Sequence, residues 1–114
     1  MTKAQREEDQ ARLERALAER ADARYVLRLY VAGLTPRSVA AIASVKRICE
    51  DHLRGRYELE VVNIYDQPTL AKGEQIIAAP TLIKKLPLPL RRLIGDMADT
   101  KKVLVGLDLR EKDS

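Results

Sequence analysis

Tyr25–Val31 (YVLRLYV), with Ala32-Gly33 and then Thr35-Pro36 after it, is the stretch that decides the fold. It is rich in β-forming residues and almost continuously apolar, which is typical of a strand covered on both faces. Thr35 is a good N-cap residue, and Pro36 fits the first helical position because its missing N–H costs nothing there. The stretch therefore predicts a buried strand that leads directly into a helix.

The following segment completes a repeating unit. The helix is predicted to run to about Leu53 and to end before Gly55. Glu58–Tyr65 (ELEVVNIY) then has the pattern of a second strand. A strand, a helix and a strand predict a right-handed βαβ unit with parallel strands. One helix face is expected to be apolar and to carry Val39, Ile42, Val45, Ile48, Cys49 and Leu53.

The second half of the chain has a less definite pattern. Asp66, a turn or N-cap residue before Gln67-Pro68, opens a shorter segment that ends near Ile77. Thr81–Leu86 is predicted to be a third strand. Pro80 stands at its entry, because proline cannot donate to a central ladder, and a cis peptide bond is compatible with that position.

Two later segments fit both kinds of secondary structure. Arg91–Ile94 is compatible with a strand or a helix. In Lys102–Leu109 the residues Val103, Val105, Leu107 and Leu109 alternate as in a strand, whereas Val103, Leu104 and Leu107 also fit one helical face. Gly106 weakens both interpretations, so the choice stays open.

Residues 1–24 differ in amino-acid composition from the remainder of the chain. They are rich in Ala, Arg, Glu and Leu and contain neither Gly nor Pro, which favours a helix. The apolar stripe around Leu13 and Leu17 is too narrow to bury much surface, so this helix is either solvated or an oligomerising arm. We predict a charged helical extension at 1–24, one domain at 25–110 and a short tail at 111–114.

Length and composition exclude several classes of protein. A chain of 114 residues has room for one domain. Without a long apolar segment or an apolar stretch after a charged N-terminus, we expect no membrane span, no secretory signal and a cytoplasmic location. The single cysteine, Cys49, excludes an internal disulfide, and no P-loop, dinucleotide fingerprint or metal cluster is present. We therefore expect no cofactor, no metal and no enzymatic activity.

Basic charge is concentrated in one segment of a chain whose formal net charge is +4. Residues 84–102 hold six basic side chains against two acidic ones, whereas the charges of residues 1–83 almost cancel. Concentrated charge steers association, so an acidic protein surface, nucleic acid or solvent alone are the alternatives for this segment. No aromatic residue lies among these basic side chains, which makes nucleic acid the weakest of the three.

Several long strings of this sequence resemble the KaiB family of circadian clock proteins. They are Tyr25–Gly33 with Thr35-Pro36 and Ser38-Val39, then Ala79–Leu82, Arg91–Asp96 and Lys102–Leu109. Together they cover nearly all of the predicted domain. The chain departs from typical cyanobacterial members in its N-terminal extension, in Leu88 between Pro87 and Pro89, and in a shortened acidic tail.

The resemblance implies a binding protein. KaiB proteins bind the N-terminal ATPase ring of KaiC and modulate its phosphorylation and ATPase cycle, and in full clocks they help sequester KaiA and engage output kinases. The family also switches fold, from a ground-state tetramer of order βαββααβ to a thioredoxin-like monomer of order βαβαββα that binds KaiC. For this chain we expect an α/β, thioredoxin-like, fold-switching domain with a KaiC-like partner. A KaiA-like protein or an output kinase is a further candidate, and a dimer or tetramer is the expected ground state.

The resemblance and the charge pattern together nominate two sets of residues. The predicted partner-binding residues are Lys84, Lys85, Arg91 and Arg92, followed by Lys101 and Lys102. By family position, the predicted fold-switch residues are Gly106, Asp108, Pro80, Pro87 and Pro89. A segment that adopts two packings needs a sequence whose local preferences are compatible with both. The C-terminal half meets this condition, because its pattern fits a strand as well as a helix.

The alternative is a thioredoxin-like redox or stress protein that acts without KaiC. A thioredoxin places its reactive CxxC at the start of the first helix of its fold, where the helix dipole and exposed N–H groups lower a thiol pKa. Here that position reads Gly33–Ser38 (GLTPRS), without sulfur, and Cys49 lies about three turns downstream on the apolar face. His52, the only histidine, has no nucleophile beside it and is expected to serve a helix end. Redox exchange is therefore not supported.

Overall fold

The computed structural model describes residues 2–18, 24–76, 79–95 and 97–109, and contains one four-stranded sheet with helices on both faces. The elements are α1 (Lys3–Ala18), β1 (Tyr25–Val31), α2 (Pro36–His52), β2 (Tyr57–Asn63), α3 (Pro68–Gly73), β3 (Thr81–Leu86), β4 (Arg91–Ile94) and α4 (Thr100–Gly106). After α1 the order is βαβαββα, so the predicted thioredoxin-like α/β fold is confirmed.

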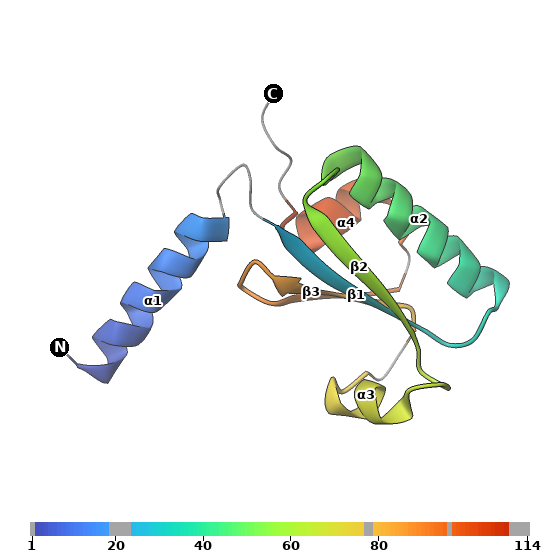
Figure 1. Ribbon diagram of the computed structural model, residues 1–114, viewed down its shortest axis with the longest axis horizontal. Coiled ribbons are helices and arrows are strands. Elements are labelled where there is room, and N and C mark those ends of the chain that lie inside the picture. The colour runs from blue at the N-terminus through green and yellow to red at the C-terminus, as the bar shows by residue number, and fades with distance from the viewer. Residues whose placement is uncertain (1, 19–23, 77–78, 96, 110–114) are drawn as a thin grey trace.

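The strand order in the sheet is β2-β1-β3-β4. β1 runs parallel to β2, as predicted for a βαβ unit, and antiparallel to β3. β4 returns antiparallel to β3 and forms the outer strand on that side. In Figure 1 the helices α2 and α4 lie on one face of the sheet and α3 lies on the other, which gives three layers.

The central position of β1 explains its continuous apolar sequence. Alternate residues from Tyr25 to Val31 face α2 and α4, where they join the larger core cluster with Leu82 of β3. Tyr30 points to the other face and packs with Val62 and Ile83 under α3. Both faces of β1 are thus covered by helices, as the sequence pattern indicates.

The α2 helix begins as predicted, but its buried face differs from the expected one. The Thr35 hydroxyl accepts a hydrogen bond from the Ser38 N–H at 3.1 Å, which caps the helix. Val39, expected on the apolar face, is 53% exposed and lies outside the buried face. Small residues join Val45, Ile48 and Cys49 on the buried face of the helix. The buried residues of α2 are Ser38, Ala41, Ser44, Val45, Ile48 and Cys49.

The two ambiguous C-terminal segments adopt different structures. Arg91–Ile94 is a strand because it pairs with β3 along its whole length. The later segment is helical from Thr100 to Gly106: Val103 and Leu107, one helical turn apart, are both fully buried, whereas Val105 between them is 73% exposed. The helical spacing of Val103 and Leu107 therefore describes this segment, and the strand-like alternation of Val103, Val105 and Leu107 does not.

The charged helix predicted within residues 1–24 is present as α1, which lies apart from the sheet (Figure 1). Leu13 is 61% exposed, and Arg12 forms ion pairs with Glu8 and Asp9 at 3.7 Å. The side chain of Leu17, residues 19–23 and the predicted tail lie outside the described residues.

Asn63, the last residue of β2, connects the loop that follows β1 with the loop that follows β2. Its Oδ1 accepts hydrogen bonds from the Gly33 N–H at 3.2 Å and from the Tyr65 N–H at 3.0 Å. Gly33 has φ +72°, a conformation that favours glycine, and the Tyr65 ring lies 3.6 Å from where its Cβ would be. Asp66, predicted as a turn residue, follows in the turn that its N–H closes onto the Asn63 carbonyl.

Replacing Asn63 with alanine removes the acceptor of two loop N–H groups. We expect the free energy of unfolding to fall by about 1–3 kcal/mol, measured by urea denaturation. Asn63→Asp keeps an accepting oxygen and is the matched control, with a smaller expected loss. An Asn63→Ala variant as stable as the control would contradict this role.

Cys49 is 1% exposed on the buried face of α2, as predicted for a small core residue. Burial, followed by the nearby charge of Glu50, raises the pKa of its thiol from 9.0 to about 12. The unfolded thiol therefore ionises before the folded one. The protonated, buried thiol contributes fully to the free energy of unfolding below about pH 9, and this contribution is lost as the pH rises toward 12.

We accordingly expect the free energy of unfolding of the wild-type chain to decrease from about pH 8 to about pH 10.5 more steeply than that of Cys49→Ala. The comparison of slopes removes the contribution of tyrosine and lysine titration, which both proteins share. Urea denaturation across this pH range provides the measurement. Parallel slopes in the two proteins would show that the thiol does not ionise in the way its burial requires.

Candidate partner-binding surface

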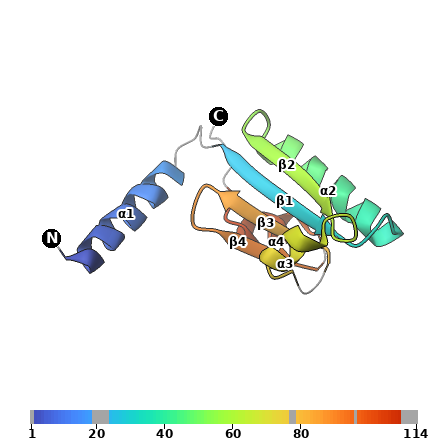
Figure 2. The same ribbon diagram turned by 60° about the horizontal axis from the view of Figure 1, so that its bottom comes forward.

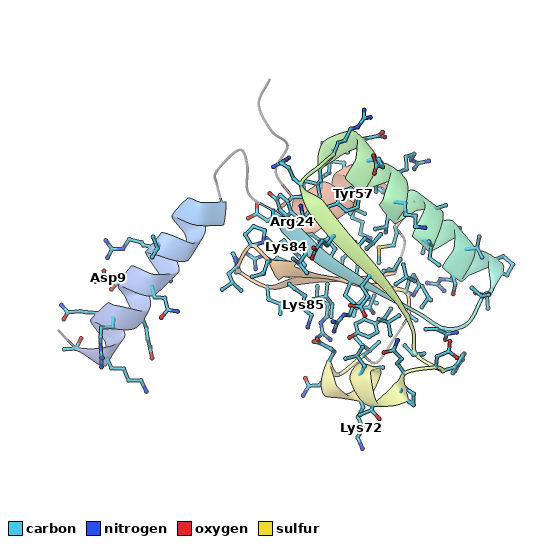
Figure 3. The ribbon with its side chains drawn as sticks, in the orientation of Figure 1. Asp9, Arg24, Tyr57, Lys72, Lys84 and Lys85 are labelled. Carbon is cyan, nitrogen blue, oxygen red and sulfur yellow. The ribbon has the colours of Figure 1, made fainter. Side chains whose placement is uncertain are left out.

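Strand alternation separates the two lysines that the sequence places together. Lys84 pairs with Leu27 and Arg91 in the sheet and points to the face of α2 and α4, where it is fully buried. Lys85 points to the α3 face, and Figure 3 shows the two side chains on opposite sides of the sheet. The amine of Lys84 is therefore not accessible to a partner in this packing, and its role in partner binding stays a prediction.

Lys85 belongs to a cluster of charges on the α3 face. Its ammonium group is paired with the Glu74 carboxylate, just beyond α3. The same carboxylate lies 3.4 Å from Arg28 Nη1, and Arg28 Nε donates to Glu60 at 3.2 Å. The cluster thus joins β1, β2, β3 and the end of α3.

The cluster perturbs the ionisation of its members. A hydrogen bond with the Tyr30 hydroxyl, and to a lesser degree the charge of Glu60, raises the pKa of Arg28. Burial lowers the pKa of Lys85, and the positive charges of Arg28 and Arg92 lower it further.

Arg92 reaches from β4 to the same helix end. Its guanidinium donates to the Glu74 carbonyl at 2.7 Å and to the Gln75 carbonyl at 3.1 Å. Arg92 and Lys85 consequently position α3 against the sheet, in addition to any contact with a partner.

Sequence reasoning did not identify Arg28, Glu60 or Glu74 as members of this surface. Arg28 and Glu60 could have been predicted from the sequence, because they carry opposite charges and become neighbours once β1 and β2 pair in parallel register. No local pattern marks Glu74, whose place depends on how α3 packs.

The hairpin of β3 and β4 carries the most open part of the predicted surface. Arg91 and Arg92 are exposed. Three apolar side chains accompany them, with exposed fractions of 48% for Leu86, 48% for Leu90 and 44% for Ile94. We call these five residues the hairpin surface. Lys101 and Lys102 are also exposed, but they lie in the first turn of α4.

The predicted fold-switch residues occupy connections and helix ends. Pro80 precedes β3, and Pro87 and Pro89 lie in the β3–β4 connection; all three follow cis peptide bonds. Gly106 ends α4, and a Cβ there would lie 3.4 Å from Leu93 Cδ1. Asp108 has φ +52°, in the left-handed region that side chains seldom adopt.

The N-terminus of α2, where a thioredoxin has its reactive thiols, carries none. A groove of about 270 Å³ lies there, and it is lined by Arg37, Ala40, Ala41, Pro80, Gly95, Met97 and Ala98. Among the described residues no group of three or more His, Cys, Asp or Glu could hold a metal ion. His52 is the last residue of α2, and its carbonyl accepts a hydrogen bond from Arg56. No helix in the described part is long and apolar enough to cross a membrane.

Comparison with solved structures shows the same fold. The chain is similar to the N-terminal domain of Synechococcus elongatus SasA, with a TM-score of 0.59 and 24% identity over 71% of this chain and 76% of that one. It is also similar to mitochondrial thioredoxin 3 of Saccharomyces cerevisiae, with a TM-score of 0.60 and 12% identity over 86% of this chain and 87% of that one. At these identities the likeness concerns the fold alone.

Comparison of sequences gives the family. Residues 28–109 match the model of the KaiB domain. The circadian clock oscillator protein KaiB of Rippkaea orientalis is 50% identical over 95 residues, which cover 79% of this chain and 91% of the relative. That of Synechococcus elongatus is 53% identical over 85 residues, which cover 75% of this chain and 83% of the relative. The chain therefore belongs to the KaiB family of circadian clock proteins.

Proposed function

We propose that this chain is a non-catalytic, cytoplasmic clock component that binds the ring of a KaiC-type ATPase and modulates its phosphorylation and ATPase cycle. The observation that carries the proposal is the order βαβαββα in a member of the KaiB family. The resemblance assigns this order to the KaiC-binding state of the family. A ground-state dimer or tetramer with the other order, and further contact with a KaiA-like protein or an output kinase, belong to the same proposal.

The chemistry of the sole cysteine argues for binding and against the redox alternative. Thiol exchange needs an accessible thiolate. Cys49 is buried, and its pKa is raised to about 12, so the thiolate is scarce at neutral pH. The helix end that faces Pro80 contains no sulfur that could replace it. The thioredoxin-like shape therefore supports recognition of a partner.

A pull-down of a KaiC-type ATPase with the tagged full-length chain, in the presence of ATP, tests the proposal directly. We expect the ring to be retained with ATP. A chain that retains no ring at micromolar concentrations of both proteins would refute the proposal. A KaiC-like reading frame beside the gene would supply the natural partner for this experiment.

Charge reversal of Arg91 is expected to weaken the complex. Arg91 is exposed and lies on the face of the sheet opposite α3, so Arg91→Glu changes the surface without breaking the α3 cluster. We expect the Kd to rise about fivefold to tenfold at low salt, with a smaller difference at high salt. Arg6→Glu, on exposed α1, is the matched control with the same change of charge. Equal effects of the two variants would exclude a specific role of Arg91.

Gly106→Ala is expected to favour the packing in which α4 is helical. Alanine is a better helix former than glycine by about 1 kcal/mol, which corresponds to about a fivefold change in a two-state population. The contact of the new Cβ with flexible Leu93 requires only a small shift. NMR spectra of the wild-type and variant chains would measure the ratio of states. A single, unaltered state in both would count against fold switching at this position.

A further inference from the structure

The outer side of β4 is an open sheet edge. In the order β2-β1-β3-β4, β4 has a neighbour on one side only among the described residues. Figure 2 shows β4 beyond β3, on the side of the sheet away from β2. An edge strand presents unpaired N–H and C=O groups, to which another extended chain can add.

The register identifies the backbone groups that point outward. In an antiparallel pair, hydrogen-bonded and non-hydrogen-bonded residue pairs alternate. The Gly95 N–H donates to the Pro80 carbonyl at 3.1 Å, and this pair adjoins the pair of Thr81 and Ile94. Ile94 is therefore in a non-hydrogen-bonded position, and so is Arg92 two residues earlier. The N–H and C=O groups of these two residues face away from β3.

The side chains around this edge favour one kind of occupant. Ile94 and Arg92 lie on the α3 face, and exposed Arg91 lies on the other face. Leu90 adds exposed apolar surface where the hairpin enters β4. An extended segment with acidic side chains opposite the two arginines and an apolar side chain opposite Ile94 would match both the charge and the apolar contact. A second copy would bring four arginines to one ribbon, which disfavours self-pairing.

We propose that β4 accepts an extended, acidic segment of the partner protein as a fifth strand, through the outward backbone groups of Arg92 and Ile94. The inference deepens the proposed function, on which it rests for the identity of the partner. Backbone hydrogen bonds would supply part of the affinity, and the arginines would select the acidic segment.

The first experiment uses the full chain, a KaiC-type ATPase ring and ATP. Ile94→Pro removes an outward N–H, and edge strands tolerate proline at such positions. We expect the affinity to fall about tenfold, whereas Ile94→Val, which keeps the N–H and a branched side chain, should stay within about twofold. In the unmodified chain the amides of Arg92 and Ile94 should exchange hydrogen more slowly once the ring is bound. This second readout does not depend on the folding of the proline variant.

Unchanged exchange at both amides in a complex that forms would overturn strand addition and leave the proposed function intact. If no complex forms, the proposed function fails, and a synthetic peptide decides the inference. The probe is the eight-residue peptide Thr-Val-Thr-Glu-Glu-Thr-Val-Thr, which in an antiparallel register can place Val opposite Ile94 and Glu opposite Arg92 and Arg91, with a fully N-methylated copy as the control. NMR shifts of the Arg92 and Ile94 amides with the unmethylated peptide alone would support the inference. Equal shifts, no shifts, or self-association abolished by Ile94→Pro would overturn it.

Discussion

The placement of β1 between two strands of opposite direction is the constraint on which the rest of the structure depends. β1 pairs in parallel with β2 and antiparallel with β3, so both of its sides are hydrogen-bonded. Its two faces are covered as well, by α2 and α4 on one side and α3 on the other. The parallel pairing of β1 with β2 requires the α2 crossover, and the antiparallel pairing of β3 with β4 allows the short connection between those two strands.

This arrangement also distributes the charges. Because successive residues of a strand point to opposite faces, adjacent Lys84 and Lys85 serve different layers of the molecule. Lys85 pairs with the carboxylate of Glu74, and Arg92 donates to the carbonyls at the end of α3. Part of the basic segment is thereby used to hold α3 on the sheet. The other exposed basic groups of this segment lie on β4 and α4, and the proposed partner surface is placed there.

The thioredoxin-like shape and the absent thioredoxin chemistry have a common explanation. The fold places the start of α2 beside Pro80, and a groove remains there. A thiol at that position would make the groove a redox site, whereas Cys49 is enclosed in the core with a raised pKa. The chain shares the architecture of thioredoxins without a reactive thiol at this position.

The local sequence was sufficient for most elements of the first half of the domain and for β3. β1, the Thr35 cap, the start of α2 and β3 all follow from residue type and period, because strand burial, capping and proline geometry act over a few neighbours. The family resemblance was carried by long strings of residues, and it implied two alternative orders of the elements. Among the candidate site residues, the exposure of Arg91 and Arg92 agrees with expectation.

The remaining features were decided by tertiary structure. Arg91–Ile94 is a strand because its backbone pairs with β3. The segment that begins at Thr100 is a helix because this conformation places Val103 and Leu107 on the same side, where both are buried in the core. Burial of Lys84, exposure of Val39 and the contacts of Glu74 depend on which faces meet across the sheet. The sequence by itself determined the elements whose stabilising contacts are local. Only the tertiary structure decided the segments and side chains whose contacts come from distant parts of the chain.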